Sequence, residues 1–125
     1  MVTSLPRHMA SIWKRLVNAT RYSLMGLRAA FRHEEAFRLE VLVLLFVVPA
    51  GLWMGKTCVQ RVLLIGSWCL VIVVELLNSA IEALVDRTGL ERDELAGRAK
   101  DMGSAAVFCA IVLAAAVWLL ILATP

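Results

Sequence analysis

The chain has 125 residues, of which 61% are apolar, and its mean hydropathy is +0.79. This length bounds the chain to a single domain, and the apolar share is too high for a soluble domain of this size. The formal net charge is +3, with seven of the thirteen basic residues and only two acidic residues within residues 1–38. A basic N-terminal part beside apolar segments favours an anionic membrane surface as its partner and argues against nucleic acid.

The cysteines and the N-terminal pattern argue against a disulfide framework, a cysteine metal site and a signal peptide. Cys58, Cys69 and Cys109 are odd in number and widely spaced, so they imply neither a disulfide framework nor a metal site. Basic residues recur from Arg7 to Arg38 with no early apolar core and no cleavage motif, so we expect no signal peptide.

Residues 8–31 are predicted to form an amphipathic helix, because two kinds of side chain recur at 3.6-residue spacing on opposite faces. The largely apolar face holds Trp13, Leu16, Val17, Thr20, Leu24, Leu27 and Phe31. The polar face holds Lys14, Asn18, Arg21, Arg28 and Arg32. A helix of this kind lies along the membrane surface and does not cross the bilayer.

Three segments are apolar enough to be predicted as transmembrane helices: residues 34–54, 62–85 and 102–123. The uncharged part of the first segment, residues 41–55, would span only about 22 Å at 1.5 Å per residue. That is short for a hydrocarbon core of about 30 Å. We therefore expect this helix to begin near Glu34 and to hold its charged residues at the interface.

Two polar connections separate the predicted spans and indicate their orientation. Residues 55–61 form a turn with Lys56 and Arg61, and residues 86–101 form a loop with four basic and five acidic residues. With three spans, the N-terminal helix and this loop lie on one side, and the turn and the C-terminus lie on the other. The positive-inside rule predicts that the first side is cytoplasmic.

A polar stripe follows the second span. Glu75, Asn78, Ser79, Glu82 and Asp86 lie at i, i+3, i+4, i+7 and i+11, so they share one helix face. A carboxylate inside hydrocarbon costs about 2.5–3.5 kcal/mol on insertion scales, and such residues are functional-site candidates. A stripe that only joins helices would suit Asn and Ser, but three acids need a proton, a cation or water.

The same side of the membrane is predicted to hold further charged residues: Glu34, Glu40, Arg98, Lys100 and Asp101. Glu75 and Glu82 are two helical turns apart, or about 10 Å. This spacing can serve a reacting hydroxyl and a metal-bound phosphate at different depths. The gathering of acids and bases is typical of a site for a divalent metal and phosphates.

Three stretches closely resemble the prokaryotic integral-membrane diacylglycerol kinase family: RYSLMGLRAAFRHEEAFRLE, RVLLIGSWCLVIVVELLNSAIEALVDR and ELAGRAKDMGSAAV. The resemblance implies an all-α membrane protein with one surface helix and three transmembrane helices per chain, assembled as a homotrimer. It implies transfer of the γ-phosphoryl of MgATP to 1,2-diacylglycerol, giving phosphatidic acid. It also implies a bacterial inner membrane, with the N-terminus cytoplasmic and the C-terminus periplasmic.

The resemblance implies roles for individual residues as well. Glu75 matches the general base for the lipid hydroxyl, and Glu34 and Glu82 match the carboxylates that bind Mg²⁺. The positions expected to contact ATP are Arg15, Tyr22, Glu34, Glu82, Glu91, Arg92, Asp93, Lys100 and Asp101. The positions expected to contact the lipid are Arg15, Ser23, Arg28, Phe31, Glu40, Trp53, Arg61, Glu75 and Ser104. Asn78 and Asp86 match supporting polar positions.

Two other functions stay open at this point. An undecaprenol kinase of the same fold would phosphorylate a polyprenyl alcohol in place of diacylglycerol. A small proton-coupled transporter would use Glu75 to carry protons, although such a protein seldom needs the charged GRAKD segment beside an acidic stripe. Three helices are too few to enclose both ATP and a lipid, which favours an oligomer.

Overall fold

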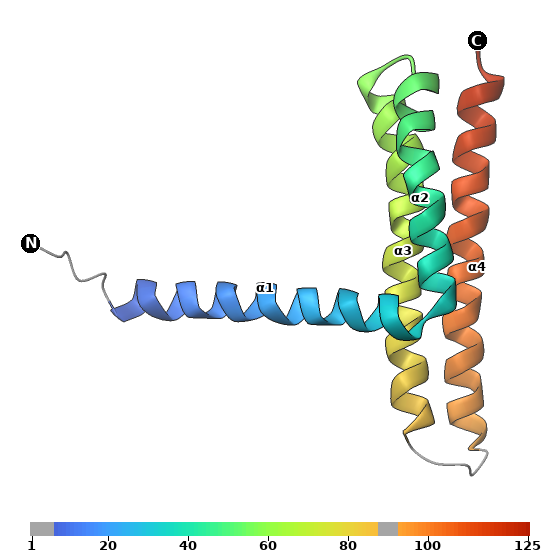
Figure 1. Ribbon diagram of the computed structural model, residues 1–125. Coiled ribbons are helices and arrows are strands. Elements are labelled where there is room, and N and C mark those ends of the chain that lie inside the picture. The colour runs from blue at the N-terminus through green and yellow to red at the C-terminus, as the bar shows by residue number, and fades with distance from the viewer. Residues whose placement is uncertain (1–6, 88–92) are drawn as a thin grey trace, which may run out of the picture. The chain divides into compact units, whose positions relative to one another are not determined.

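The computed structural model describes residues 7–87 and 93–125. Within these ranges the regular structure is entirely helical, with four helices: α1 (Arg7–His33), α2 (Glu35–Met54), α3 (Cys58–Asp86) and α4 (Glu94–Ala123) (Figure 1). The chain divides into two compact units, residues 1–33 and residues 34–125. The described part of the protein is therefore all-α, and each unit is described by itself.

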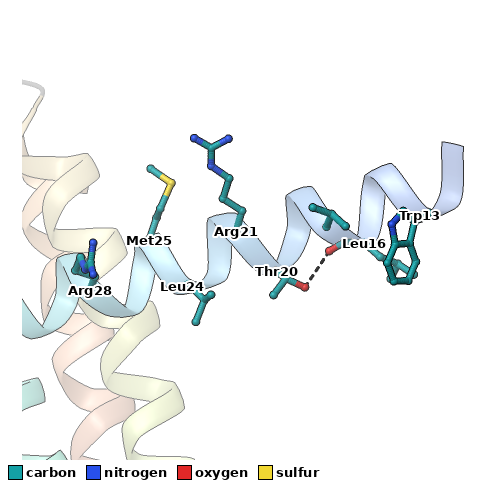
Figure 2. Close-up of a pocket in the computed structure, with 8 residues that line it drawn as sticks. Trp13, Leu16, Thr20, Arg21, Leu24, Met25 and Arg28 are labelled. Atoms are coloured by element: carbon teal, nitrogen blue, oxygen red, sulfur yellow. Dashed lines mark hydrogen bonds between the residues drawn. The ribbon is translucent and has the colours of Figure 1, made fainter. Parts of the chain in front are cut away.

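Helix α1 is a single helix of 27 residues with Arg32 and His33 in its last turn, where positive charge favours the helix dipole. Arg21 and Leu24 project from opposite sides of it (Figure 2). Thr20 Oγ1 donates a hydrogen bond to the Leu16 carbonyl oxygen at 2.9 Å. A groove of about 760 Å³ runs along α1 and is lined by Trp13, Leu16, Val17, Thr20, Arg21, Leu24, Met25 and Arg28. These lining residues all belong to α1, so its apolar side chains remain uncovered within their own unit.

In the second unit, α3 packs against both α2 and α4 (Figure 1). Leu64 and Val71 of α3 are fully buried, and Val71 forms a core cluster with Ala110 and Ala114 of α4. Alanines one turn apart let two helix backbones approach closely. The packing of this bundle therefore depends on small residues of α4 against branched residues of α3.

Two indole groups connect the three helices of the bundle. Trp68 Nε1 of α3 donates a hydrogen bond to the Glu40 carbonyl oxygen of α2 at 2.9 Å. Trp118 Nε1 of α4 donates to the Leu64 carbonyl oxygen of α3 at 3.0 Å. An unpaired N–H group would be costly in hydrocarbon. Because each indole N–H is paired with one particular carbonyl oxygen, these bonds also fix the axial positions of the helices.

Helices α2, α3 and α4 are each long and apolar enough to cross a membrane, with mean hydropathies of 1.9, 2.1 and 2.9 over their most apolar windows. The described part of the chain therefore has an all-α fold with three candidate membrane spans. The 29 residues of α3 extend about 43 Å at 1.5 Å per residue, which exceeds a hydrocarbon core of about 30 Å. The excess length lets the charged residues near Asp86 and the start of α4 lie outside the hydrocarbon.

Two helices begin earlier than the hydropathy of the sequence predicts. Helix α3 begins at Cys58, before residue 62, because the Thr57 hydroxyl caps it by accepting from the Gln60 N–H at 3.2 Å. Helix α4 begins at Glu94, before residue 102, because Asp93 Oδ1 accepts from the Leu95 N–H at 3.1 Å. Hydropathy marks only the part of a helix that lies in lipid, whereas capping determines where the helix starts.

Candidate active site

A cleft of about 400 Å³ opens between α2, α3 and α4, and we call it the acidic cleft. It is lined by Glu34, Ala36, Glu75, Asn78, Glu82, Ser104, Val107, Phe108 and Ile111. Five of these residues are site residues predicted from the sequence: Glu34, Glu75, Asn78, Glu82 and Ser104. Residues far apart in the chain are thus brought together around one concave space.

Helix α3 supplies the most buried polar side chains of the acidic cleft. Glu75 is 5% exposed and Asn78 is 8% exposed, and Asn78 Nδ2 donates a hydrogen bond to Glu82 Oε1 at 3.3 Å. These residues recur every three or four positions, so an α-helix presents them to the same side. The amide therefore sits between the two glutamates along α3 and orients the outer one.

Helix α2 and the residue before it supply two further acids: Glu34 lines the cleft, whereas Glu40 is not among the lining residues. Glu34 has an extended backbone and immediately precedes α2, so its side chain lines the cleft from the helix entrance. Glu40 is buried within α2, close enough to Glu75 for the two charges to interact. Within the described residues, Glu40 Oε2 has no hydrogen-bond partner. Carboxylates this close together require protons or cations to neutralise their negative charge.

Helix α4 gives the cleft an apolar wall that the sequence prediction missed. Val107, Phe108 and Ile111 follow Ser104 at i+3, i+4 and i+7, and all four line the cleft. This spacing is a helical face, so the apolar residues could have been found by extending the period of 3.6 from Ser104. The cleft therefore combines carboxylates with a hydrocarbon-like surface.

Charged residues near the ends of α3 and α4 have separate surroundings. Lys100 Nζ forms an ion pair with Asp86 Oδ1 at 2.9 Å, and both side chains are solvent-accessible. Asp101 is exposed, and Asp93 caps α4. The predicted ATP contacts Glu91 and Arg92 lie outside the described residues.

Several predicted site residues do not line the acidic cleft. Arg15, Tyr22, Ser23, Arg28 and Phe31 are exposed on α1, in the other unit. Trp53 is 86% exposed and lies about 27 Å along α2 from its start at 1.5 Å per residue. Arg61 is near the same end and donates from Nε to the Gly55 carbonyl oxygen at 3.0 Å.

The donor set of the acidic cleft fits Mg²⁺ bound together with a nucleotide. Glu34 and Glu82 line the same space, whereas no group of three His, Cys, Asp or Glu side chains converges as a metal cage in the part of the chain that the structure describes. Mg²⁺ usually takes one or two carboxylates, several waters and phosphate oxygens, and it seldom occupies an all-protein cage. Two carboxylates in an open cleft meet that requirement.

The fold and the cleft together define a small helical membrane protein with an acidic site bounded by an apolar wall. A model of the family described as prokaryotic diacylglycerol kinase matches residues 21–122. The chain therefore belongs to the prokaryotic diacylglycerol kinase family. Members of this family are phosphotransferases, and the chain is a diacylglycerol kinase by this membership.

Three bacterial relatives illustrate the extent of the similarity. The diacylglycerol kinase of Escherichia coli strain K12 is 53% identical over 108 residues, covering 86% of this chain and 88% of the relative. The diacylglycerol kinase of Haemophilus influenzae is 50% identical over 103 residues, covering 82% and 87%. That of Pseudomonas aeruginosa is 50% identical over 109 residues, covering 87% and 89%. With three apolar helices and bacterial relatives, the chain is a bacterial membrane protein.

Proposed function

We propose that the protein transfers the γ-phosphoryl of ATP to the free hydroxyl of 1,2-diacylglycerol in the acidic cleft, giving phosphatidic acid and ADP. The observation that carries this proposal is the shared position of Glu34, Glu75 and Glu82 around one cleft. The apolar wall beside these carboxylates suits the hydrocarbon part of a lipid. Membership of the diacylglycerol kinase family supports the choice of substrate.

Glu75 is the proposed general base. Its carboxylate accepts the proton of the lipid hydroxyl while the hydroxyl oxygen bonds to the γ-phosphorus. The bond between that phosphorus and the β,γ-bridging oxygen breaks, and ADP leaves with the electron pair. Phosphoryl transfer depends mostly on positioning and electrostatic stabilisation, and the deep burial of Glu75 at 5% exposure keeps competing water away from the hydroxyl.

Glu34 and Glu82 are the residues that would hold Mg²⁺. When bound, Mg²⁺ supplies positive charge that neutralises the phosphate oxygens. Asn78 donates to Glu82 and so keeps that carboxylate turned in one direction. These residues therefore orient the nucleotide, while Glu75 acts on the lipid.

The remaining contacts are proposed from the family resemblance. ATP would contact Arg15, Tyr22, Glu91, Arg92, Asp93, Lys100 and Asp101. The lipid would contact Arg15, Ser23, Arg28, Phe31, Glu40, Trp53, Arg61 and Ser104. Because several of these residues do not line the acidic cleft of one chain, a homotrimer with sites between subunits is part of the proposal, and α1 would lie on the membrane surface.

The proposed topology has a cytoplasmic N-terminus and a C-terminus in the periplasm. Lys56 lies in the turn between α2 and α3, at the same end of the bundle as the C-terminus (Figure 1). A membrane-impermeant amine reagent should therefore label Lys56 in whole cells and right-side-out spheroplasts, whereas Lys100 should react only in inverted vesicles. Labelling of Lys56 from the cytoplasmic side alone would contradict the proposal.

The activity itself is tested by MgATP-dependent phosphorylation of lipid in mixed micelles. Diacylglycerol and undecaprenol are compared at equal mole fraction, with Glu75→Gln as the control for enzymatic transfer. We expect radiolabelled phosphatidic acid with the unaltered protein and almost none with the variant. A preference for undecaprenol would indicate a polyprenol kinase. No transfer to either lipid would contradict the kinase proposal and favour the transporter hypothesis.

A further inference from the structure

Gly103 is a buried residue of α4 that lies against Asn78 of the acidic cleft. A Cβ atom built on Gly103 would overlap Asn78 Oδ1 and would lie 3.3 Å from Asn78 Cγ. The three nearest neighbours of that position all belong to Asn78. Glycine is thus needed here because the amide of Asn78 occupies the space of a side chain.

This contact determines how the amide of Asn78 is turned. Its Oδ1 atom faces Gly103, and its Nδ2 atom donates to Glu82 Oε1 at 3.3 Å. A carboxylate only accepts hydrogen bonds, so the amide must present its NH₂ end to Glu82. Asn78 is 8% exposed, which leaves little freedom for another orientation.

We propose that Gly103 is a positioning residue for the kinase reaction, because it leaves room for Asn78 Oδ1 and so holds Asn78 Nδ2 against the Glu82 carboxylate. A methyl group at residue 103 would displace the amide and deprive Glu82 of its donor. Loss of an outer partner of a metal ligand typically costs about 10- to 100-fold in metal affinity or activity. The inference rests on the proposed role of Glu82 in binding Mg²⁺.

A different explanation is that Gly103 serves helix packing alone, as Ala110 and Ala114 do in the core cluster. The side chain opposite Gly103 differs in kind from the one opposite the two alanines. Val71 packs against the alanines, whereas the atoms opposite Gly103 are those of a polar amide that is bonded to a site residue. A packing role predicts that Gly103→Ala lowers the unfolding temperature but leaves the Mn²⁺ affinity of the folded protein unchanged, whereas a positioning role predicts that Mn²⁺ affinity falls in the folded protein.

The experiment compares Gly103→Ala with Gly66→Ala in purified protein in detergent. Gly66 also lies inside a long apolar helix, but a Cβ built there meets nothing within 4 Å. We expect Gly103→Ala to weaken the apparent Mg²⁺ affinity in the lipid kinase assay about 10- to 100-fold. Gly66→Ala should stay within about threefold of the unaltered protein. Mn²⁺ binding in the presence of a non-hydrolysable ATP analogue, followed by electron paramagnetic resonance, should weaken in parallel.

The same measurements in an Asn78→Ala background test whether the effect of Gly103→Ala acts through the amide of Asn78. Once the amide is gone, adding Gly103→Ala should change Mn²⁺ affinity and activity by less than about threefold. If Gly103→Ala alone fails to fold, the double variant should recover assembly, because the overlap has been removed. The inference is overturned if Gly103→Ala behaves like Gly66→Ala, if its loss persists undiminished in the Asn78→Ala background, or if the double variant also fails to fold. Absence of lipid phosphorylation by the unaltered protein would instead refute the proposed function.

Discussion

The acidic cleft and the turn between α2 and α3 are both rich in polar groups, but they use them differently. In the turn, the Lys56 N–H donates to Gln60 Oε1 at 2.8 Å, and the Gln60 N–H donates to Thr57 Oγ1. Arg61 Nε then donates to the Gly55 carbonyl oxygen. These polar groups satisfy one another within a few residues of sequence, so the turn reverses the chain without any outside partner.

In and beside the acidic cleft, by contrast, some buried polar atoms have no hydrogen-bond partner among the described residues. Among the described residues, Asn78 Oδ1 in the cleft and Glu40 Oε2, whose charge is close to Glu75, are buried and have no hydrogen-bond partner, and Glu75 is only 5% exposed. A buried polar atom without a partner costs about 1–3 kcal/mol, so this arrangement does not favour the stability of the chain alone. Polar residues of the turn thus complete the fold, whereas those of the cleft are retained at a cost in stability and are available to a ligand.

The largest expected effect is that of Glu75→Gln. The amide keeps the shape of the side chain but cannot accept the hydroxyl proton, so kcat should fall by about 10²- to 10⁴-fold. Burying an amide costs less than burying a charge, so thermal unfolding in detergent should occur at an equal or higher temperature. A well-folded variant that turns over within about threefold of the unaltered protein would remove Glu75 from the mechanism.

Glu34→Gln and Glu82→Gln should produce the next largest effects. A neutral amide is a poor ligand for a hard dication, and even partners outside the ligand shell affect metal affinity or activity by about 10- to 100-fold. We therefore expect each variant to raise the apparent KM for MgATP or lower kcat by at least tenfold. Titration of Mg²⁺ at fixed ATP is the measurement, and unchanged activity in both variants would refute this role.

Lys100→Ala should have an intermediate effect. The ion pair of Lys100 with Asp86 is partly exposed, with 41% and 66% of the two side chains accessible, and exposed pairs contribute little to stability because solvent screens them. The unfolding temperature should therefore change little, whereas KM for MgATP should rise by about tenfold through loss of a charged contact. Asp86→Asn breaks the same ion pair but retains the ammonium group, so it should raise KM less than Lys100→Ala does. Equal effects of the two variants would assign Lys100 to the ion pair alone.

The smallest effect on catalysis is expected at the turn. Thr57→Ala removes the hydroxyl that caps α3, and loss of such a cap typically lowers the free energy of unfolding by about 1 kcal/mol. Lipid kinase activity at saturating substrates should stay unchanged, because the turn satisfies its own polar groups and lies away from the cleft. Denaturation in mixed micelles and the kinase assay on one preparation test both parts. A loss of turnover without a loss of stability would contradict the assignment of the turn to folding and of the cleft to catalysis.

The sequence alone determined the class of the protein and one face of its site. Apolar segments identified three spans, and the period of 3.6 residues predicted that Glu75, Asn78 and Glu82 share a side of one helix. Both results depend on local spacing, which a helix preserves regardless of its neighbours. The predicted topology placed Glu34 on the same side of the membrane, and family motifs added Ser104. The structure brings both residues to the same cleft.

What lies opposite that face depends on tertiary packing, which helix periodicity does not reveal. The apolar wall of Val107, Phe108 and Ile111, and the contact of Gly103 with Asn78, depend on how far α4 is shifted along α3. That shift is set by small residues in the core and by the indole hydrogen bond from Trp118 to Leu64. Periodicity shows which residues of one helix share a face, but the axial register between two helices comes from side-chain packing and hydrogen bonds across their interface.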